Sequence, residues 1–208
     1  MQLYAITDRS SLPGTEQQRR AALVALARNW AQHGIDYIQI REKDLVPSDL
    51  LALTKQIISA VRQQTTHTRI LLNGPAQIAL EAGADGIHLP TNAPQNAAEQ
   101  TRNLFHHAGR EATISQSCHN LEEIRKANKA SLILYAPVFE KTVYGESNLP
   151  GHGLEALKRA VEAAKPIPVF ALGGVTKQNA PSCIKAGAAG IAAIRLFLNA
   201  VDPNEPRI

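Results

Sequence analysis

The chain has 208 residues, 44% of them hydrophobic and 19% charged, which is the composition of a globular domain with room for a sizeable core. Its net charge of +4 suits an anionic ligand, but there is no long basic tract and no aromatic–basic interleaving, so nucleic acid is not an expected partner. We also expect no membrane association, since no apolar run is long enough to span a bilayer and no signal peptide is evident. Cys118 and Cys183 lack metal-ligand spacing, which favours a reduced, cytoplasmic protein.

Short apolar runs alternate with amphipathic segments along the whole chain. The runs predict strands over residues 3–6, 35–40, 69–72, 86–89, 112–115, 132–135, 167–172 and 188–194. The amphipathic segments predict helices over residues 16–33, 48–61, 75–82, 97–107, 121–128, 154–164 and 178–186, and a last short helix from Phe197. Ser48 and Asn120 are the expected N-caps of the second and fifth helices.

Strict alternation of strand and helix predicts a parallel sheet that is covered by helices. Eight strands in that order are typical of a closed barrel, so we predict that residues 1–208 form a single-domain (β/α)8 TIM barrel. An open, doubly wound sheet is the alternative. It usually has fewer strands and a dinucleotide fingerprint, which this sequence lacks.

Candidate functional residues follow the predicted strand ends, where the active sites of (β/α)8 barrels lie. They are Asp8, Gln39, Arg41, Lys43, Asn73, His88, His119, Lys141, Gly173, Gly174 and Arg195. The strand interiors are apolar, whereas polar side chains collect at this one rim. That asymmetry indicates an enzyme.

Gln39, Arg41 and Lys43 occupy alternate positions at the end of the second predicted strand. A period of two places them on one side of the strand, facing the barrel mouth. Two cations and an amide there can bind a phosphate or a pyrophosphate. The alternative is a salt bridge within the barrel or an ion pair with Glu42. We favour the ligand, because two inward cations without one would repel each other.

The turn Gly173-Gly174 ends the seventh predicted strand, and Ile194-Arg195 ends the eighth. Glycines leave backbone N–H groups open to a ligand, and the following helix adds the positive end of its dipole. We therefore predict that these two segments bind a phosphate group.

His119 follows the fifth predicted strand, and an imidazole near a helix N-terminus can move protons near neutral pH. A capping or core role is the alternative. Cys118 is expected to be a small buried residue rather than a nucleophile. His88 is expected to fill the barrel, and His106 and His107 to lie on the surface of an outer helix.

An ordered set of motifs along nearly the whole chain resembles the thiamine phosphate synthase and TenI family. The motifs are Tyr4-Ala-Ile-Thr-Asp8, Ile38-Gln-Ile-Arg-Glu-Lys43, Gly83-Ala-Asp-Gly-Ile-His-Leu89, Ser117-Cys-His119, Pro137-Val-Phe139, Ala171-Leu-Gly-Gly-Val175 and Ala186-Gly-Ala-Ala-Gly-Ile-Ala192. The resemblance implies a (β/α)8 barrel that binds a thiazole phosphate. It also implies that the phosphate is held by the Gly173-Gly174 turn and by the backbone after the eighth strand.

The chain departs from the synthases at the positions where they resemble one another in holding Mg²⁺ on the pyrophosphate. Their Asn-Asp pair after the third strand is Asn73-Gly74 here, and the segment Leu89-Pro-Thr-Asn92 has no carboxylate. Because Mg²⁺ prefers anionic oxygen ligands, we expect no tight Mg²⁺ site in the free protein, and Mg²⁺ as a cofactor only for a synthase. The loop that ends in lysine in the synthases corresponds to Phe139-Glu-Lys-Thr142, which makes Lys141 a candidate for substrate binding.

Three functional hypotheses follow from the resemblance. The variants at Gly74 and Pro90 resemble TenI-type thiazole tautomerases, in which the histidine matching His119 is the proposed acid and base. The leading hypothesis is therefore a thiamine biosynthesis enzyme that shifts a proton on a carboxythiazole phosphate. Gln39 and Lys43 instead resemble the synthase, which joins thiazole phosphate to hydroxymethylpyrimidine pyrophosphate and releases pyrophosphate. The third hypothesis is a non-catalytic protein that binds thiamine intermediates, and the sequence leaves a homo-oligomer open.

Overall fold

The structure, a computed structural model, describes residues 1–140 and 150–198. Its strands are β1 (Gln2–Ile6), β2 (Tyr37–Ile40), β3 (Arg69–Leu72), β4 (Gly86–Leu89), β5 (Thr113–Cys118), β6 (Leu132–Tyr135), β7 (Val169–Leu172) and β8 (Gly190–Ala193). Its helices are the 3₁₀ turn η1 (Arg9–Ser11), α1 (Glu16–Gln32), α2 (Pro47–Arg62), α3 (Ala76–Ala82), α4 (Ala97–His107), α5 (Leu121–Lys126), α6 (Gly153–Ala164), α7 (Ala180–Lys185) and α8 (Arg195–Leu198).

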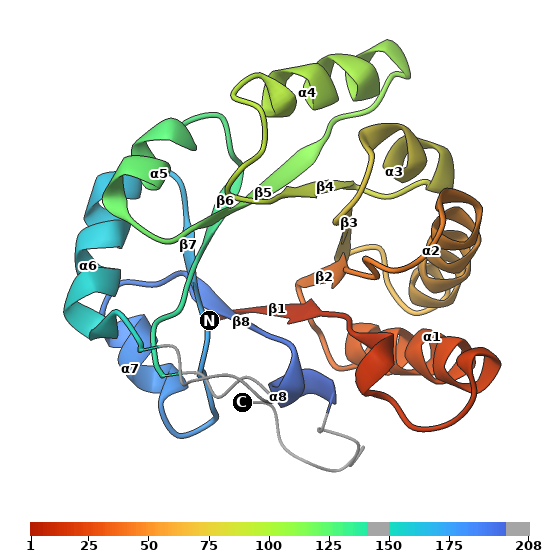
Figure 1. The fold of residues 1–208 in the computed structure, drawn as a ribbon, viewed down its shortest axis with the longest axis horizontal. Helices are drawn as coiled ribbons and strands as arrows, with labels where there is room; N and C mark the ends of the chain where they lie inside the picture. The colour runs from red at the N-terminus through yellow and green to blue at the C-terminus, as the bar shows by residue number, and fades with distance from the viewer. Residues whose placement is uncertain (141–149, 199–208) are drawn as a thin grey trace.

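The strands form a closed parallel barrel in chain order, and Figure 1 shows the helices as a ring around it. β1 pairs with β8 as well as with β2, which closes the sheet. In the closing pair, Gln2 lies opposite Gly190 and Ala5 lies opposite Ala193. The (β/α)8 barrel that the alternating pattern predicted is therefore confirmed. Among the described residues, no helix is long and apolar enough to cross a membrane.

Two apolar clusters stabilise the barrel, one on each side of the sheet. The larger cluster lies between the strands and the helices and consists mainly of aliphatic residues. The smaller one fills the barrel, where the rings of Tyr4, Tyr37 and Phe170 pack with centroids 5.6 to 5.9 Å apart. Gly190 makes room for them, since a Cβ there would lie 2.7 Å from the Phe170 ring. Because side chains fill the barrel interior, a ligand is expected at an end of the barrel, where the strands stop.

Several predicted boundaries shift in the structure. Ser48 is not an N-cap, because α2 already begins at Pro47, whose missing N–H costs little in a first turn. β5 extends to Cys118 instead of ending at Ser115, because the three consecutive polar residues Ser115, Gln116 and Ser117 concealed the strand. The last helix begins at Arg195, two residues before the predicted start.

Other elements agree closely with the predictions. β3, β4, β6 and α4 have the predicted bounds. Asn120 caps α5 as expected, since its side-chain oxygen accepts a hydrogen bond of 2.9 Å from the backbone N–H of Glu123. These elements place the strand ends where the functional residues were predicted.

Candidate active site at the carboxyl ends of the strands

The predicted site residues lie at the carboxyl rim of the barrel at different depths. Gln39 is buried inside it. The half-buried residues are Arg41, Asn73, Gly173, Gly174 and Ile194, and the exposed ones are Lys43, His119 and Arg195. The predicted Lys141 lies outside the described residues.

A chain of hydrogen bonds crosses the barrel interior below this rim. The Tyr4 hydroxyl donates to Gln39 Oε1 at 3.0 Å and lies 2.9 Å from Ser115 Oγ. Ser115 Oγ also lies 2.8 Å from His88 Nδ1, and His88 Nε2 lies 3.0 Å from Ser117 Oγ. The chain thus connects β1, β2, β4 and β5, and it ends at Ser117, nearest the mouth.

The number of available protons fixes which group donates and which accepts in each of these hydrogen bonds. Tyr4 uses its hydrogen on Gln39, so Ser115 must donate to Tyr4. Ser115 then has no hydrogen left for His88, so His88 Nδ1 must carry one and donate to Ser115. In a neutral ring, Nε2 then accepts from Ser117. The network therefore selects the Nδ1–H tautomer of His88.

The environment of His88 keeps that imidazole neutral. Burial, followed by the charges of Arg41 and Lys43, lowers the pKa of His88 to about 3. Both cations lie near enough to act on one interior imidazole, and their direction toward the mouth stays a prediction.

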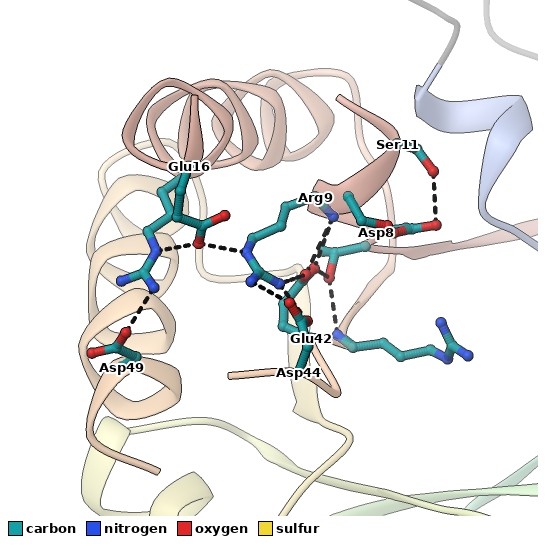
Figure 2. A network of polar contacts seen from close by, with 11 residues as sticks. Asp8, Arg9, Ser11, Glu16, Glu42, Asp44 and Asp49 are labelled. Carbon is teal, nitrogen blue, oxygen red and sulfur yellow. Dashed lines mark hydrogen bonds and ion pairs between the residues drawn. The ribbon is translucent and has the colours of Figure 1, made fainter. Parts of the chain in front are cut away.

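Glu42 lies between these two cations in the chain but faces the other way. It is buried, and its carboxylate pairs with Arg9 Nη1 at 2.9 Å instead of with Arg41 (Figure 2). The alternative of an Arg41–Glu42 ion pair is therefore wrong. With Glu42 bound to Arg9, Arg41 and Lys43 are not neutralised by the carboxylate between them.

Asp8, a further rim candidate, is held within its own turn. It accepts hydrogen bonds from the hydroxyl groups of Ser10 at 2.6 Å and Ser11 at 2.8 Å. Partial burial acts to raise its pKa, but these hydroxyls and the charge of Arg41 together lower the pKa of Asp8 below its usual value. Asp8 is thus a fixed anion near Arg41.

Farther along the same rim, after β7, Gly173 and Gly174 both adopt positive φ, at 91° and 64°. A Cβ on Gly173 would lie 2.7 Å from Pro137 Cα, and one on Gly174 would lie 2.6 Å from the Glu140 carbonyl oxygen. Both positions therefore need glycine because the residues after β6 pack against them, whether or not a ligand binds there. Because Leu172 pairs with Ala192, the two predicted phosphate-binding segments leave adjacent strands at the same rim.

His119 lies at the edge of the rim, in a groove of about 370 Å³ between α5 and α6. Its Nδ1 lies 2.6 Å from the Ala136 carbonyl oxygen, which identifies this nitrogen as the donor. Tyr135, His152 and Arg159 line the same groove. His119 is thus placed with other titratable groups, while Gln39, Arg41 and His88 gather in the barrel mouth.

The remaining cysteine and histidine predictions agree with the structure. Cys118 is fully buried, and burial raises its thiol pKa to about 12, which makes it a poor nucleophile. His88 fills the barrel as expected. His106 and His107 lie exposed on α4.

The residues present do not form the carboxylate set that the resemblance implies for Mg²⁺. The described ranges contain no group of three or more His, Cys, Asp or Glu side chains placed to hold a metal ion. Gly74 stands where the resemblance implies a carboxylate, and residues 89–92 offer none. The Mg²⁺ affinity of the protein stays a prediction.

Sequence reasoning missed Tyr4, Ser115 and Arg9 as contributors to the site. Ser115 had a usable signal, since Ser115 and Ser117 lie two apart and an inward-facing strand side carries polar groups only when they have partners. Arg9 had none, because it lies in η1, 33 residues away from Glu42 in the sequence.

Comparisons with known proteins agree with this architecture. Residues 3–197 match the family described as thiamine monophosphate synthase. A putative thiamine-phosphate synthase of Geobacter sulfurreducens is 35% identical over 98% of this chain and 89% of its own length. The thiamine-phosphate synthase of Syntrophomonas wolfei is 31% identical over 96% of this chain and 90% of its own. The solved structure of thiamine phosphate pyrophosphorylase from Pyrococcus furiosus superposes with a TM-score of 0.77 at 28% identity, covering 97% of this chain and 89% of that one. The chain therefore belongs to the thiamine monophosphate synthase family of enzymes.

Proposed function

We propose that the protein is a thiamine-phosphate synthase, which joins hydroxymethylpyrimidine pyrophosphate to a thiazole phosphate and releases pyrophosphate. The names of its relatives support this reaction over the tautomerase that the sequence first suggested. The observation that carries the proposal is the segment after β2, where the Glu42 carboxylate is bound by Arg9 and does not pair with Arg41.

In this proposal, the residues after β2 bind one substrate, and those after β7 and β8 bind the other. Arg41 and Lys43 bind the pyrophosphate and stabilise the negative charge that develops on it as it leaves. The backbone N–H groups at Gly173-Gly174 and Ile194-Arg195 hold the thiazole phosphate. The pyrimidine ring binds above the buried hydrogen-bond network, whose two ends are Gln39 and Ser117.

The test is a coupling assay of the full chain with both substrates, with and without Mg²⁺. Formation of thiamine phosphate from the two substrates supports the synthase. Binding of both substrates without any turnover would instead support the non-catalytic hypothesis and contradict the proposal.

A thiazole tautomerase is the second candidate, favoured by the variants at Gly74 and Pro90 and by His119 at the rim. Here we expect His119→Ala to lower kcat by about 10²–10⁴-fold, because general acid–base catalysis is lost. Affinity for the thiazole phosphate should stay nearly constant, and His106→Ala on the outer surface of α4 serves as the control. Full tautomerase activity in His119→Ala would contradict this role.

A further inference from the structure

We propose that Glu42 is a positioning residue that acts, with Thr7 and Arg9, to hold Arg41 and Lys43 toward the barrel mouth. The inference rests on the proposed function, since it assigns Arg41 and Lys43 to pyrophosphate. None of the three positioning residues needs to touch the ligand.

The Glu42 carboxylate is surrounded by hydrogen-bond donors. It accepts from the Thr7 hydroxyl at 2.5 Å, from the backbone N–H of Arg9 at 3.2 to 3.3 Å, and from Arg9 Nη1 at 2.9 Å. Its side chain is 2% exposed, and that of Arg9 is 5% exposed. A buried carboxylate with this many donors has one stable orientation, and that orientation points away from the mouth.

Thr7 links Glu42 to Arg41. The Thr7 hydroxyl donates to Glu42, so its lone pairs are free to accept, and it accepts from the backbone N–H of Arg41 at 2.9 Å. The same residue is anchored to β2 by its own N–H, which donates to the Gln39 carbonyl at 2.9 Å. Thr7 thus holds the backbone at the point where Arg41 leaves the strand.

Lys43 lies in the sequence between Glu42 and Asp44, two of the three carboxylates that Arg9 binds. Figure 2 shows the Arg9 guanidinium between Glu42, Asp44 and Glu16. It donates to both oxygens of Asp44 at 2.7 Å. Residues 43 and 44 form the turn after β2, and the Leu45 N–H closes it by donating to the Glu42 carbonyl at 3.3 Å. Because Arg9 binds the residues on both sides of Lys43, the backbone that carries Lys43 is held in place.

The experiment measures binding of inorganic pyrophosphate to the full chain by isothermal titration calorimetry. Thr7→Val replaces the hydroxyl with a methyl group of similar shape, and Thr7→Ser keeps the hydroxyl. Because Thr7→Val leaves the Arg41 N–H and one Glu42 oxygen without this partner, we expect pyrophosphate affinity to fall about 10-fold. Thr7→Ser should restore it to within about twofold of wild type, and Glu42→Gln should weaken it at least as much as Thr7→Val.

Melting temperatures of all variants, followed by circular dichroism, separate positioning from folding. If Thr7→Val binds pyrophosphate like the wild type, or if Thr7→Ser loses as much affinity as Thr7→Val, the positioning role is overturned and the proposed function stands. If the wild type itself binds no pyrophosphate, the assignment of Arg41 and Lys43 fails and the inference fails with it.

Discussion

Two neighbouring corners of the barrel rim are proposed to bind anions, and they use different groups. At the β1–β2 corner the proposed groups are the side chains of Arg41 and Lys43, next to the buried ion pair between Glu42 and Arg9. At the β7–β8 corner the proposed groups are backbone N–H groups, at a glycine turn that packs against the residues after β6.

The two constructions should respond differently to mutation. A side chain at the first corner can be removed while the barrel stays intact, so the substitution should lower ligand affinity with little change in the free energy of unfolding. The backbone of the second corner cannot be altered without disturbing its packing, so stability is lost together with binding. The predictions below test this contrast.

The largest effect is expected for Gly173→Ala at the β7–β8 corner. The added Cβ would lie 2.7 Å from Pro137 Cα, and the residue has a φ of 91°. Left-handed strain and overpacking together should lower the free energy of unfolding by about 3 kcal/mol. Urea denaturation measures this loss. Gly109→Ala is the matched control, because its φ is 69° and an added Cβ meets no atom within 4 Å in the described part of the chain. It should cost about 1 kcal/mol, and equal losses in the two variants would refute the packing argument.

Arg41→Ala tests the other corner. Loss of a charged hydrogen-bond donor should weaken pyrophosphate binding by about 10- to 100-fold, because such contacts contribute about 1.5–3 kcal/mol. The melting temperature should change little, since Glu42 keeps its partner Arg9. Calorimetry with pyrophosphate provides the affinity, and Arg125→Ala on α5 controls for the loss of a positive charge elsewhere. A large fall in melting temperature would remove the contrast between the corners.

His88→Asn examines the interior that supports the side-chain corner. The pKa of His88 is lowered to about 3 in the folded protein, against about 6.5 in an unfolded chain. Between these values the unfolded state binds the additional proton, so acidification destabilises the wild type by at most about 1.4 kcal/mol per pH unit.

The His88→Asn variant should therefore have a flatter dependence of unfolding free energy on pH below about 6.5. Denaturation series from pH 7 to pH 5 measure it, with His106→Asn on the surface of α4 as the control. Parallel curves for His88→Asn and wild type would show that His88 is not kept neutral by the fold.

The smallest effect is expected for Asp44→Asn, which removes the exposed partner of Arg9. Asp44 is 68% exposed, so water replaces much of what the ion pair contributes. The melting temperature should fall by less than about 2 °C. A fall as large as that of Glu42→Gln, measured alongside it, would mean that the outer carboxylate is as important to the corner as the buried one.

The barrel could be predicted because its signals are local. Each of β3, β4 and β6 is a short apolar run beside turn residues, and these bounds are matched in the structure. The placement of Arg41 and Lys43 in the mouth stays a prediction, because β2 ends at Ile40 and the alternation of sides on which it was based ends with the strand.

The partners of these residues could not be predicted, because they come from distant parts of the chain. Arg9 meets Glu42 across 33 residues, and Tyr4 meets Ser115 across 111. No spacing rule connects such pairs. The direction of His119 was equally inaccessible, because β5 ends at Cys118 and the alternation of sides ends with the strand.

The turn after β2 has a consequence in terms of segment length. β2 ends at Ile40, and the Leu45 N–H donates to the Glu42 carbonyl, so the Glu42 and Asp44 carboxylates reach Arg9 from the two ends of one tight turn. Deleting one residue between β2 and this turn would displace both carboxylates from Arg9 and would move Lys43 with them. The composition would barely change, yet the ion pairs that fix this corner would be lost. Spacing, rather than residue content alone, thus sets the charge that this corner presents.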